Sequence, residues 1–588
     1  MSMPISFVNT NSIWAGVFVE TLVRLGLRMA IACPGFRSTP LTVAVAGHPE
    51  LEAIPMLDER SAAFFALGVA RQTHRPVMLI CSSGTAGANF FPAVIEARES
   101  GVPLIVLTAD RPPELQNCGA GQAIDQAKLY GDFAVWYQGL AVPEADLNQL
   151  AYLRQSIAQG YRRAIATPGP VHFNQPFRDP LPPIPDPPNG SKCDRLSKIL
   201  ANPAPFFAHL APPPPPVPSV QIPEAWRSPI PRGVIVAGPA QPQNPEKYCQ
   251  AVTTLSQKLG WPVLAEGLSP IRNYAHLNPN LITTYDPILR NRDRAIALQA
   301  DAVLQIGPLP TSKILRQWLL YTQARRWFLD GSSERGDRNL DPAHGPSQPI
   351  MGTVEVLAQF MEDWEDASST DYCQQWLALE GKTVGAIADL LRDEQLLIES
   401  KISWLLPQIL PKNVNLFINN SMPVRDIEWF LPPNQSQLKP FFNRGANGIE
   451  GTLSTAMGIA HANPEQLTVM LTGDLALLYD TNGFLGRSHF KGNLTIILVN
   501  NNGGGIFEML PISEFNPPFE EFFATPQNID FAKLSQTYDI SYQRIENWEE
   551  LKDAIAIKSP GNIRLLEIPT HRKKDIAWRK ETFEKLKI

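Results

Sequence analysis

The stretch LTGDLALLYDTNGFLGRSHFKGNLTIILVNNNGGGIF, residues 471–507, decides the fold of this chain. It holds the end of one apolar segment, residues 467–471, and the whole of another, residues 495–499. We interpret both segments as buried strands, because each is short, apolar and bounded by turn residues. In a parallel sheet, the loops that follow neighbouring strands converge on one crevice, where ligands bind. The stretch therefore predicts a ligand site at the carboxyl ends of these two strands.

The loops after the two strands carry oxygen donors that suit a magnesium ion. Asp474 follows the first strand and Asn501 follows the second. Mg²⁺ prefers oxygen ligands in octahedral order and usually shares its shell with substrate phosphates. The glycines at 503–505 would let the backbone approach such a phosphate closely. Either loop alone is typical of an ordinary turn or helix cap. It is the occurrence of both loops after neighbouring strands that indicates a metal site.

This pairing, a Gly-Asp dipeptide followed by an Asn-Asn dipeptide, resembles the diphosphate–metal motif of thiamine diphosphate (ThDP) enzymes. The resemblance implies that Asp474, Asn501 and the carbonyl of Gly503 hold Mg²⁺, with Mn²⁺ as an alternative ion, on the diphosphate of the cofactor. The family commonly has glycine where Leu475 stands, and this difference limits the number of subfamilies to which the chain can belong. The cofactor contacts implied in this region are Gly473, Asp474, Leu475, Asn501, Gly503 and Ile506.

The composition fits a soluble globular protein. A chain of 588 residues is too long for one hydrophobic core, and about two to four domains are expected. The net charge of −6 argues against a nucleic-acid or membrane-surface role, and no apolar run approaches the length of a membrane span. The N-terminus lacks the pattern of a signal peptide. The six cysteines are scattered without a C-x-x-C pair, so we expect a reducing, cytoplasmic location.

Strand and helix patterns alternate along most of the chain, which predicts an α/β fold with parallel sheets covered on both faces. We expect three doubly wound parallel-sheet domains of the ThDP decarboxylase type. The resemblance assigns pyrimidine binding to residues 1–180 and diphosphate and Mg²⁺ binding to residues 371–588. The proline-dense segment 181–223 is expected to be an extended linker. The central domain, residues 224–370, lacks a G-x-G-x-x-G motif, so we expect a structural role for it.

Glu59 is the candidate acid–base group. It follows an apolar strand and opens a helix rich in Ala and Phe, so burial should raise its pKa. The alternative is an ordinary acid that the helix dipole favours at a helix N-terminus. Together with the metal motif, Glu59 resembles the glutamate that ThDP enzymes hold against N1′ of the aminopyrimidine ring. That contact implies the imino form of the ring, whose nitrogen takes the thiazolium C2 proton.

A set of segments extends the resemblance over nearly all residues from 12 to 580. The chain looks most like the family of 2-succinyl-5-enolpyruvyl-6-hydroxy-3-cyclohexene-1-carboxylate (SEPHCHC) synthases of menaquinone and phylloquinone biosynthesis. That family decarboxylates 2-oxoglutarate on ThDP and adds the four-carbon carbanion to isochorismate by 1,4-attack. It builds its active site from two subunits, which implies a homodimer at least, with a tetramer as an alternative. The matching segments are CPGFRSTPL, LDER, LTADRPPEL, GQAID, NNSMPVR, NRGANGIEG, GDLALLYD and NNNGGGIFEMLP.

Both substrates of that family are dianions, so the site needs cations in a protein of negative net charge. Planar guanidinium groups suit carboxylates best. Each arginine alone is typical of a solvated surface charge, and only the resemblance brings several of them together. Lys313 is carried over from the central domain, where the match is weaker and an ordinary loop lysine is an equal alternative. The implied substrate contacts are Arg37, Arg111, Gln122, Lys313, Ser421, Arg425, Arg444, Phe507 and Leu510.

Apolar residues complete the expected site. Ile449 matches the bulky residue that ThDP enzymes wedge between the two cofactor rings, a catalytic role, although a core isoleucine has the same pattern. Ile506, Phe507 and Leu510 would form an apolar wall that keeps water from the carbanion. Phe36 departs from the family, which often has serine there, so no contact is assigned to it.

Two other functions stay open at this point. One is an acetolactate-synthase-like enzyme, which usually carries FAD, or a simple 2-oxoacid decarboxylase on the same fold. The other is a catalytically silent relative that serves as a binding or assembly subunit, against which Glu59, Asp474 and Asn501 argue. The sequence has no His-His dipeptide, which several ThDP decarboxylases use to protonate the carbanion, and this favours ligation over simple decarboxylation.

Overall fold

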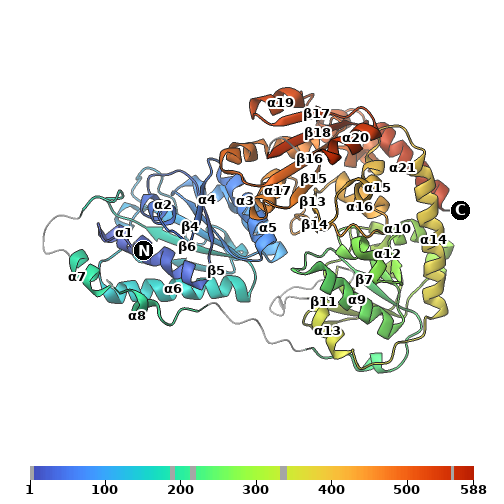
Figure 1. Ribbon diagram of the computed structural model, residues 1–588, viewed down its shortest axis with the longest axis horizontal. Helices are drawn as coiled ribbons and strands as arrows, with labels where there is room; N and C mark the ends of the chain where they lie inside the picture. Colours follow the sequence, from blue (N-terminus) through green and yellow to red (C-terminus); the bar gives the residue numbers. More distant parts are fainter. Residues whose placement is uncertain are drawn as a thin grey trace. The chain divides into compact units, whose positions relative to one another are not determined.

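The computed structural model describes residues 5–185, 192–200, 202–211, 220–330, 341–342, 344–557 and 562–587. These residues form three six-stranded sheets in which all neighbouring strands run parallel (Figure 1). The predicted fold class, α/β with three parallel sheets, is confirmed. The chain divides into two compact units, and each is described by itself. The first unit comprises Met1–Pro215, Asn443–Pro464 and Tyr479–Gly492, and the second comprises Pro216–Phe442, Glu465–Leu478 and Asn493–Ile588.

The first sheet belongs to the first unit. Its strands are β1 (Met29–Ala32), β2 (Glu52–Pro55), β3 (Val77–Cys81), β4 (Leu104–Asp110), β5 (Trp136–Gly139) and β6 (Pro170–Pro176). Its helices are α1 (Thr10–Leu25), α2 (Thr39–Ala46), α3 (Glu59–Thr73), α4 (Thr85–Asn89), α5 (Phe91–Ser100) and α6 (Leu147–Ala166). The central strands are apolar on both faces because helices cover both: α1 packs with α6 on one side, and α3 packs with α5 on the other.

The middle sheet belongs to the second unit. Its strands are β7 (Gly233–Ala237), β8 (Val263–Ala265), β9 (Leu281–Ile282), β10 (Ala302–Ile306), β11 (Arg325–Asp330) and β12 (Ser347–Met351). The helices that accompany it are α9 (Pro245–Leu259), α10 (Tyr285–Leu289), α11 (Arg292–Ala297), α12 (Lys313–Tyr321), α13 (Val354–Phe360) and α14 (Asp371–Arg392). Its strand order is β12-β11-β10-β7-β8-β9.

The third sheet also belongs to the second unit. Its strands are β13 (Asn415–Ile418), β14 (Lys439–Phe441), β15 (Leu467–Gly473), β16 (Asn493–Asn500), β17 (Ser541–Arg544) and β18 (Ile563–Pro569). The helices of this part of the chain are α15 (Glu399–Ile409), α16 (Met422–Phe430), α17 (Thr452–Ala462), α18 (Asp474–Tyr479), α19 (Phe531–Thr537), α20 (Trp548–Ala556) and α21 (Arg572–Leu586). Among them, α17 belongs to the first compact unit.

The first and third sheets share one strand order. The first is β2-β1-β3-β4-β6-β5, and the third is β14-β13-β15-β16-β18-β17. In both, the order reverses between the first strand and the third, and ligands of doubly wound sheets bind beside such a reversal, at the carboxyl ends of the strands. The loops after β1 and β3, and those after β13 and β15, are therefore the expected binding loops.

The segment 181–223, predicted as an extended linker, contains two short helices, α7 (Lys192–Ile199) and α8 (Ala204–Phe207). Apolar side chains at helical spacing explain the difference, because they give α7 a face that packs against the first domain. The buried residues are Cys193, Leu196, Leu200 and Phe207, all in the core cluster of α1 and α6. Positions 186–191, 201 and 212–219 lie outside the described residues, and the predicted domain boundaries stay a prediction.

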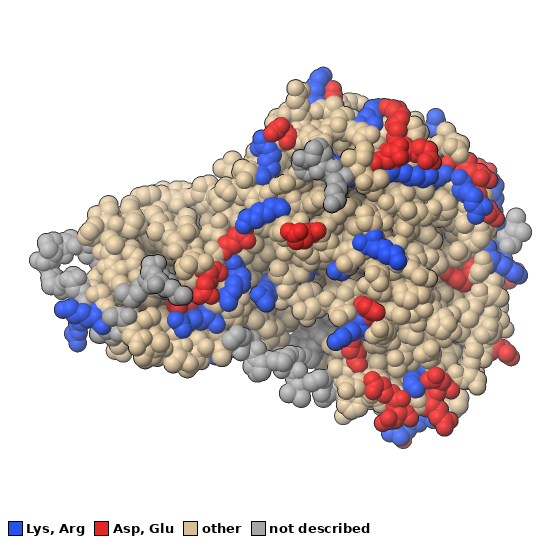
Figure 2. Space-filling model, viewed as in Figure 1, with Lys and Arg blue, Asp and Glu red and all other residues tan. Residues whose placement is uncertain are grey.

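One face of the molecule carries charged side chains of both signs (Figure 2). Figure 2 shows one face of the molecule, on which Lys and Arg side chains are interspersed with Asp and Glu side chains. The mixed charge of this face (Figure 2) agrees with the modest net charge of −6. Within the described ranges, no helix combines the length and the apolar character that a membrane span needs.

Candidate active site

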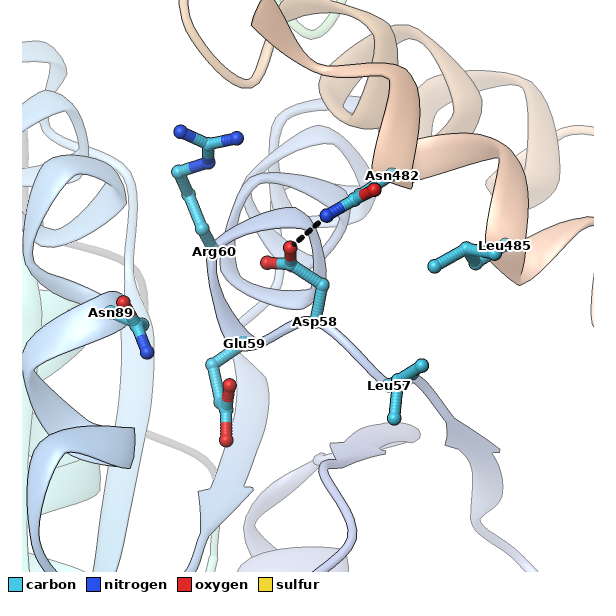
Figure 3. A pocket seen from close by; sticks show the side chains of 7 residues that line it. All are labelled: Leu57, Asp58, Glu59, Arg60, Asn89, Asn482 and Leu485. Atoms are coloured by element: carbon cyan, nitrogen blue, oxygen red, sulfur yellow. Dashed lines mark hydrogen bonds between the residues drawn. The ribbon is translucent and has the colours of Figure 1, made fainter.

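Glu59 is the first residue of α3, and its neighbour Asp58 caps that helix. Asp58 Oδ1 accepts a hydrogen bond from the Ser61 backbone N–H at 3.1 Å, and Asp58 Oδ2 accepts one from Asn482 Nδ2 at 2.7 Å. Capping is therefore the task of Asp58. The Glu59 side chain points away from the Asp58 carboxylate, into a pocket (Figure 3).

The pocket around Glu59 has a volume of about 360 Å³. Burial raises the pKa of Glu59, opposed by a hydrogen bond from its own backbone N–H and supported by the negative charge of Asp58. The neighbouring cation, Arg60, is engaged elsewhere: it donates to the Tyr479 carbonyl at 2.9 Å and lies over the Tyr479 ring. A carboxyl group of raised pKa in a pocket can exchange a proton with a bound group. The pocket is lined by Leu57, Asp58, Glu59, Arg60, Asn89, Asn482 and Leu485.

Arg37 and Arg111, predicted to bind substrate, lie close together in the first unit. Arg37 Nη1 donates to the Phe177 carbonyl at 3.0 Å, and Arg111 donates to Ser83 Oγ and to Gln122 Oε1, the latter at 3.4 Å. Burial lowers the pKa of Arg111, and the like charge of Arg37 lowers it further. Two neighbouring guanidinium groups of this kind form a site that favours an anion.

A buried polar network holds the loop that carries Arg111. Asp110 Oδ1 accepts from the Arg111 backbone N–H at 2.7 Å, and Asp110 Oδ2 accepts from Asn174 Nδ2 at 2.7 Å. Gln126 Nε2 donates to Asn174 Oδ1 at 2.7 Å, while Gln126 Oε1 accepts from the Gly84 backbone N–H at 2.9 Å. Gln126 lies next to the GQAID segment, and no motif in the sequence indicates that this side chain connects two loops.

Asp474 begins α18, directly after β15, and is buried. Its Oδ2 accepts a hydrogen bond from the Gly503 backbone N–H at 2.8 Å, so the loops after β15 and β16 meet as predicted. Burial raises the pKa of Asp474 to about 6, against hydrogen bonds from the backbone N–H groups of Leu475, Gly503 and Asp474 itself. A buried carboxylate that meets only N–H groups is a natural ligand for a cation.

Asn501 supplies a second oxygen. Its Oδ1 is buried and has no hydrogen-bond partner among the described residues, whereas its Nδ2 donates to Glu399 Oε1 at 2.6 Å. Gly503 has a φ of 141°, and a Cβ there would lie 2.4 Å from the Ala524 carbonyl oxygen, so glycine is required. The Gly503 carbonyl accepts from the Gly505 N–H at 2.9 Å and keeps a second lone pair.

These donors fit a hard divalent cation. A carboxylate, an amide oxygen and a backbone carbonyl are the ligand types that Mg²⁺ takes, together with phosphate oxygens. The described residues contain no group of three or more His, Cys, Asp or Glu side chains suited to a metal ion. A soft or borderline metal held by such a cluster is therefore not indicated in the described part of the chain.

Three family models of thiamine pyrophosphate enzymes match the chain. The model of the thiamine pyrophosphate enzyme N-terminal TPP binding domain matches residues 14–129, thiamine pyrophosphate (TPP) being another name for ThDP. The middle domain of thiamine pyrophosphate enzymes matches residues 194–418, and the C-terminal TPP binding domain matches residues 425–562.

Curated relatives match the chain from end to end. The SEPHCHC synthase of Nostoc sp. is 54% identical over 585 residues, which cover 98% of each chain. Those of Trichodesmium erythraeum and Acaryochloris marina are 52% and 50% identical, each covering 99% of both chains. The chain belongs to the SEPHCHC synthase family of ThDP enzymes.

Several other residues predicted for this member of the SEPHCHC synthase family follow strands of the second unit. Ser421 precedes α16 with a φ of 71°, which is unusual for a residue other than glycine, and its carbonyl accepts from Arg425 Nη1 at 2.6 Å. Lys313 is the exposed first residue of α12, after β10. The 3-10 helix η6 (Gly505–Met509) carries Ile506 and Phe507, which are half-buried, and the exposed Leu510 follows it.

Arg444 and Ile449 lie on the NRGANGIEG loop before α17, in the first unit. Glu96 fixes this loop: its two carboxylate oxygens accept from the backbone N–H groups of Gly445 and Ala446 at 2.9 and 2.7 Å. Arg71 pairs with Glu96 at 2.7 Å. The structure thus groups predicted residues within each unit, and their assembly across the units stays a prediction. Phe36, to which no contact was assigned, is 65% exposed.

Proposed function

We propose that the protein is a SEPHCHC synthase. With ThDP and Mg²⁺ it decarboxylates 2-oxoglutarate and adds the remaining four-carbon unit to isochorismate in a 1,4-addition, giving SEPHCHC and CO₂. The product enters menaquinone or phylloquinone biosynthesis. The full-length relatives carry this name, so the acetolactate-synthase-like alternative is not favoured.

One observation carries the proposal. The loops after β15 and β16 bring the buried Asp474 carboxylate against the Gly503 N–H, while the buried side-chain oxygen of Asn501 has no hydrogen-bond partner in the described part of the chain. Asp474, Asn501 and the Gly503 carbonyl would hold Mg²⁺ there, with Mn²⁺ as an alternative ion. Gly473, Leu475 and Ile506 lie near these donors in the sequence and would contact the ThDP cofactor.

ThDP, when bound, supplies the carbon that bonds to the 2-oxo group and takes up the electron pair left as CO₂ departs. Glu59 would hold its proton against the ring nitrogen of the aminopyrimidine, a task that suits a carboxyl group of raised pKa. Ile449 would support the cofactor between its two rings. These roles for Glu59 and Ile449 rest on the match of their motifs to the family.

The dianionic substrates would be held by guanidinium groups. The neighbouring Arg37 and Arg111, with Gln122, offer one carboxylate site. Hydrogen bonds to charged groups contribute about 1.5–3 kcal/mol each, enough to select a dicarboxylate over a monocarboxylate. The further groups proposed to contact substrate are Lys313, Ser421, Arg425, Arg444, Phe507 and Leu510, the last two with Ile506 as an apolar wall that excludes water.

We also propose that the working form is a homodimer at least, in which Glu59 of one copy and Asp474 of the other serve the same cofactor. A complementation experiment tests this directly. Mixed dimers of Glu59→Gln and Asp474→Ala chains would contain one intact site and regain part of the activity. No recovery after verified subunit exchange would exclude shared sites.

The activity itself is tested by mixing pure protein with 2-oxoglutarate, isochorismate, ThDP and Mg²⁺. We expect consumption of isochorismate and release of an equal amount of CO₂, both abolished by omitting ThDP. Folded protein that leaves isochorismate unchanged would reject the substrate assignment. Turnover of pyruvate without isochorismate would point to the simpler decarboxylase.

A further inference from the structure

Glu399, the first residue of α15, contacts the predicted metal ligand Asn501. It is buried, with 4% of its surface exposed. Its Oε1 accepts the hydrogen bond from Asn501 Nδ2 at 2.6 Å. The two residues are separated by 102 positions in sequence, so the contact exists only in the folded chain.

This contact decides which way the Asn501 amide faces. With Nδ2 on Glu399, the amide oxygen Oδ1 is directed elsewhere, and it is the buried oxygen that has no partner among the described residues. With the amide reversed, the Asn501 and Glu399 oxygen atoms would lie about 2.6 Å apart, and the Asn501 amide nitrogen would no longer donate to Glu399. An asparagine amide otherwise rotates in a broad, nearly two-fold potential, so its orientation has to come from a neighbour.

Glu399 is itself held in place. Its Oε2 pairs with the buried Arg579 of α21, and Arg579 also binds Asp426 of α16, with Nε at 2.9 Å from Oδ1 and Nη2 at 2.7 Å from Oδ2. The Glu399 backbone N–H donates to Asp575 Oδ1 at 2.9 Å. Both carboxylate oxygens of Glu399 therefore have fixed partners, and one of these partners is the metal ligand.

We propose that Glu399 is a positioning residue for the metal site, which keeps the Asn501 oxygen turned toward the cation and relies on Arg579 to stay in place. The inference rests on the metal site of the proposed function. Groups that orient metal ligands commonly change metal affinity by about 10–100-fold when removed. The same contact links the C-terminal helix α21 to the site through Arg579.

The test measures the affinity for Mn²⁺ by electron paramagnetic resonance at saturating ThDP. This measurement needs no turnover. We expect Glu399→Ala to raise the Mn²⁺ Kd by about 10–100-fold. Glu399→Gln, which keeps an oxygen acceptor, should fall between Glu399→Ala and wild type. The matched control is Glu428→Ala, which removes another buried carboxylate paired with a buried arginine, Arg272, in the same unit. It should lower Tm comparably and leave the Mn²⁺ Kd unchanged.

A double variant keeps the proposal testable if Glu399→Ala does not fold. Asn501→Asp places a carboxylate oxygen against Glu399, and adding Glu399→Gln restores a donor between the two side chains. We expect the double variant to bind Mn²⁺ at least tenfold more tightly than Asn501→Asp alone. An equal Kd for the two would overturn the proposal, as would wild-type affinity in folded Glu399→Ala. Wild-type protein that binds no Mn²⁺ with ThDP would instead overturn the metal site itself, and with it this inference.

Discussion

Gly68 of α3 and Gly458 of α17 lie at one helix crossing, each against the backbone of the other helix. A Cβ on Gly68 would lie 2.0 Å from the Thr455 carbonyl oxygen, and a Cβ on Gly458 would lie 2.1 Å from the Phe65 carbonyl oxygen. The two helices hold equivalent places, since α3 follows β2 and α17 follows β14 in sheets of the same order. Glu59 begins the first helix, and the loop of Ile449 leads into the second.

Replacing either glycine by alanine should destabilise the protein, because backbone atoms cannot move aside as a side chain can. We expect Gly458→Ala and Gly68→Ala each to cost about 1–3 kcal/mol or more, the range for overpacked sites. The matched control is Gly381→Ala on α14, where a Cβ meets nothing within 4 Å. That change should stabilise the protein by about 0.4–1 kcal/mol. Thermal unfolding of the three variants measures the difference, and a Gly458→Ala protein as stable as wild type would refute the close packing.

Glu59→Gln should abolish turnover and leave cofactor binding largely intact. The amide keeps the shape of the side chain but cannot exchange a proton, and loss of such a group commonly costs about 10²–10⁴-fold in rate. Turnover of 2-oxoglutarate and a ThDP titration by calorimetry measure the two effects. The control is Glu20→Gln, which changes a buried carboxylate of the first domain that pairs with His48 and Arg24 outside the pocket. Near-normal turnover in Glu59→Gln would remove Glu59 from the mechanism.

Asp474→Ala should weaken ThDP and Mg²⁺ together, because one carboxylate organises the loop around Gly503 and faces the proposed cation. We expect the variant to bind ThDP equally weakly with and without Mg²⁺, as measured by calorimetry. The control is Asp286→Ala, which removes a buried carboxylate of the same unit that pairs with Arg290. Mg²⁺-dependent ThDP binding that survives in Asp474→Ala would place the cation elsewhere.

Segments with strong local patterns could be predicted from the sequence. The strand at Met29–Ala32 is a short apolar run, and the helix at Pro245–Leu259 begins at a proline and ends before Gly260, so both can be recognised from the residues alone. The edge strand β17 escaped prediction because its residues are mostly exposed and lack an apolar pattern. The helix α7 was not predicted because the prolines on both sides of it are typical of an extended linker.

For the site, residue types could be predicted but contacts could not. The loops of Asp474 and Asn501 follow strands that pair in the sheet, so their meeting follows from a parallel order. The contact between Asn501 and Glu399 could not be predicted from that order. Glu399 begins a helix far earlier in the chain and looks like an ordinary helix N-terminal acid. Glu96, which fixes the loop of Arg444, is hidden for the same reason.

Arg111→Lys should raise the KM for the carboxylate substrates with little effect on ThDP binding. Lysine keeps the charge but cannot reach Ser83 and Gln122 at once, as the fork of Arg111 does. Loss of one charged hydrogen bond, about 1.5–3 kcal/mol, corresponds to a rise in KM of roughly tenfold or more. Steady-state kinetics on both substrates measure it. The control is Arg178→Lys, an exposed arginine paired with Glu114, and an unchanged KM in Arg111→Lys would exclude a substrate contact there.

His172 should make the stability of the protein depend on pH. It is buried beside Thr108, whose Oγ1 lies 2.8 Å from His172 Nε2, and burial lowers its pKa from 6.5 to about 3. Between these values the unfolded chain binds a proton that the folded chain does not. The stability is therefore complete above pH 6.5 and is lost as the pH falls, by up to about 1.4 kcal/mol per pH unit.

His172→Gln removes this titration and keeps a polar partner for Thr108. We expect the difference in unfolding free energy between wild type and variant to rise from pH 4.5 to about 6.5 and to stay constant above it, because only wild type gains stability over that interval. Urea unfolding at several pH values measures the two profiles. The exposed His276 provides the control, since His276→Gln should leave the profile of wild type unchanged. Parallel profiles for wild type and His172→Gln would show that His172 has the same pKa in the folded and unfolded chains. That result would contradict the effect expected from its burial beside Thr108.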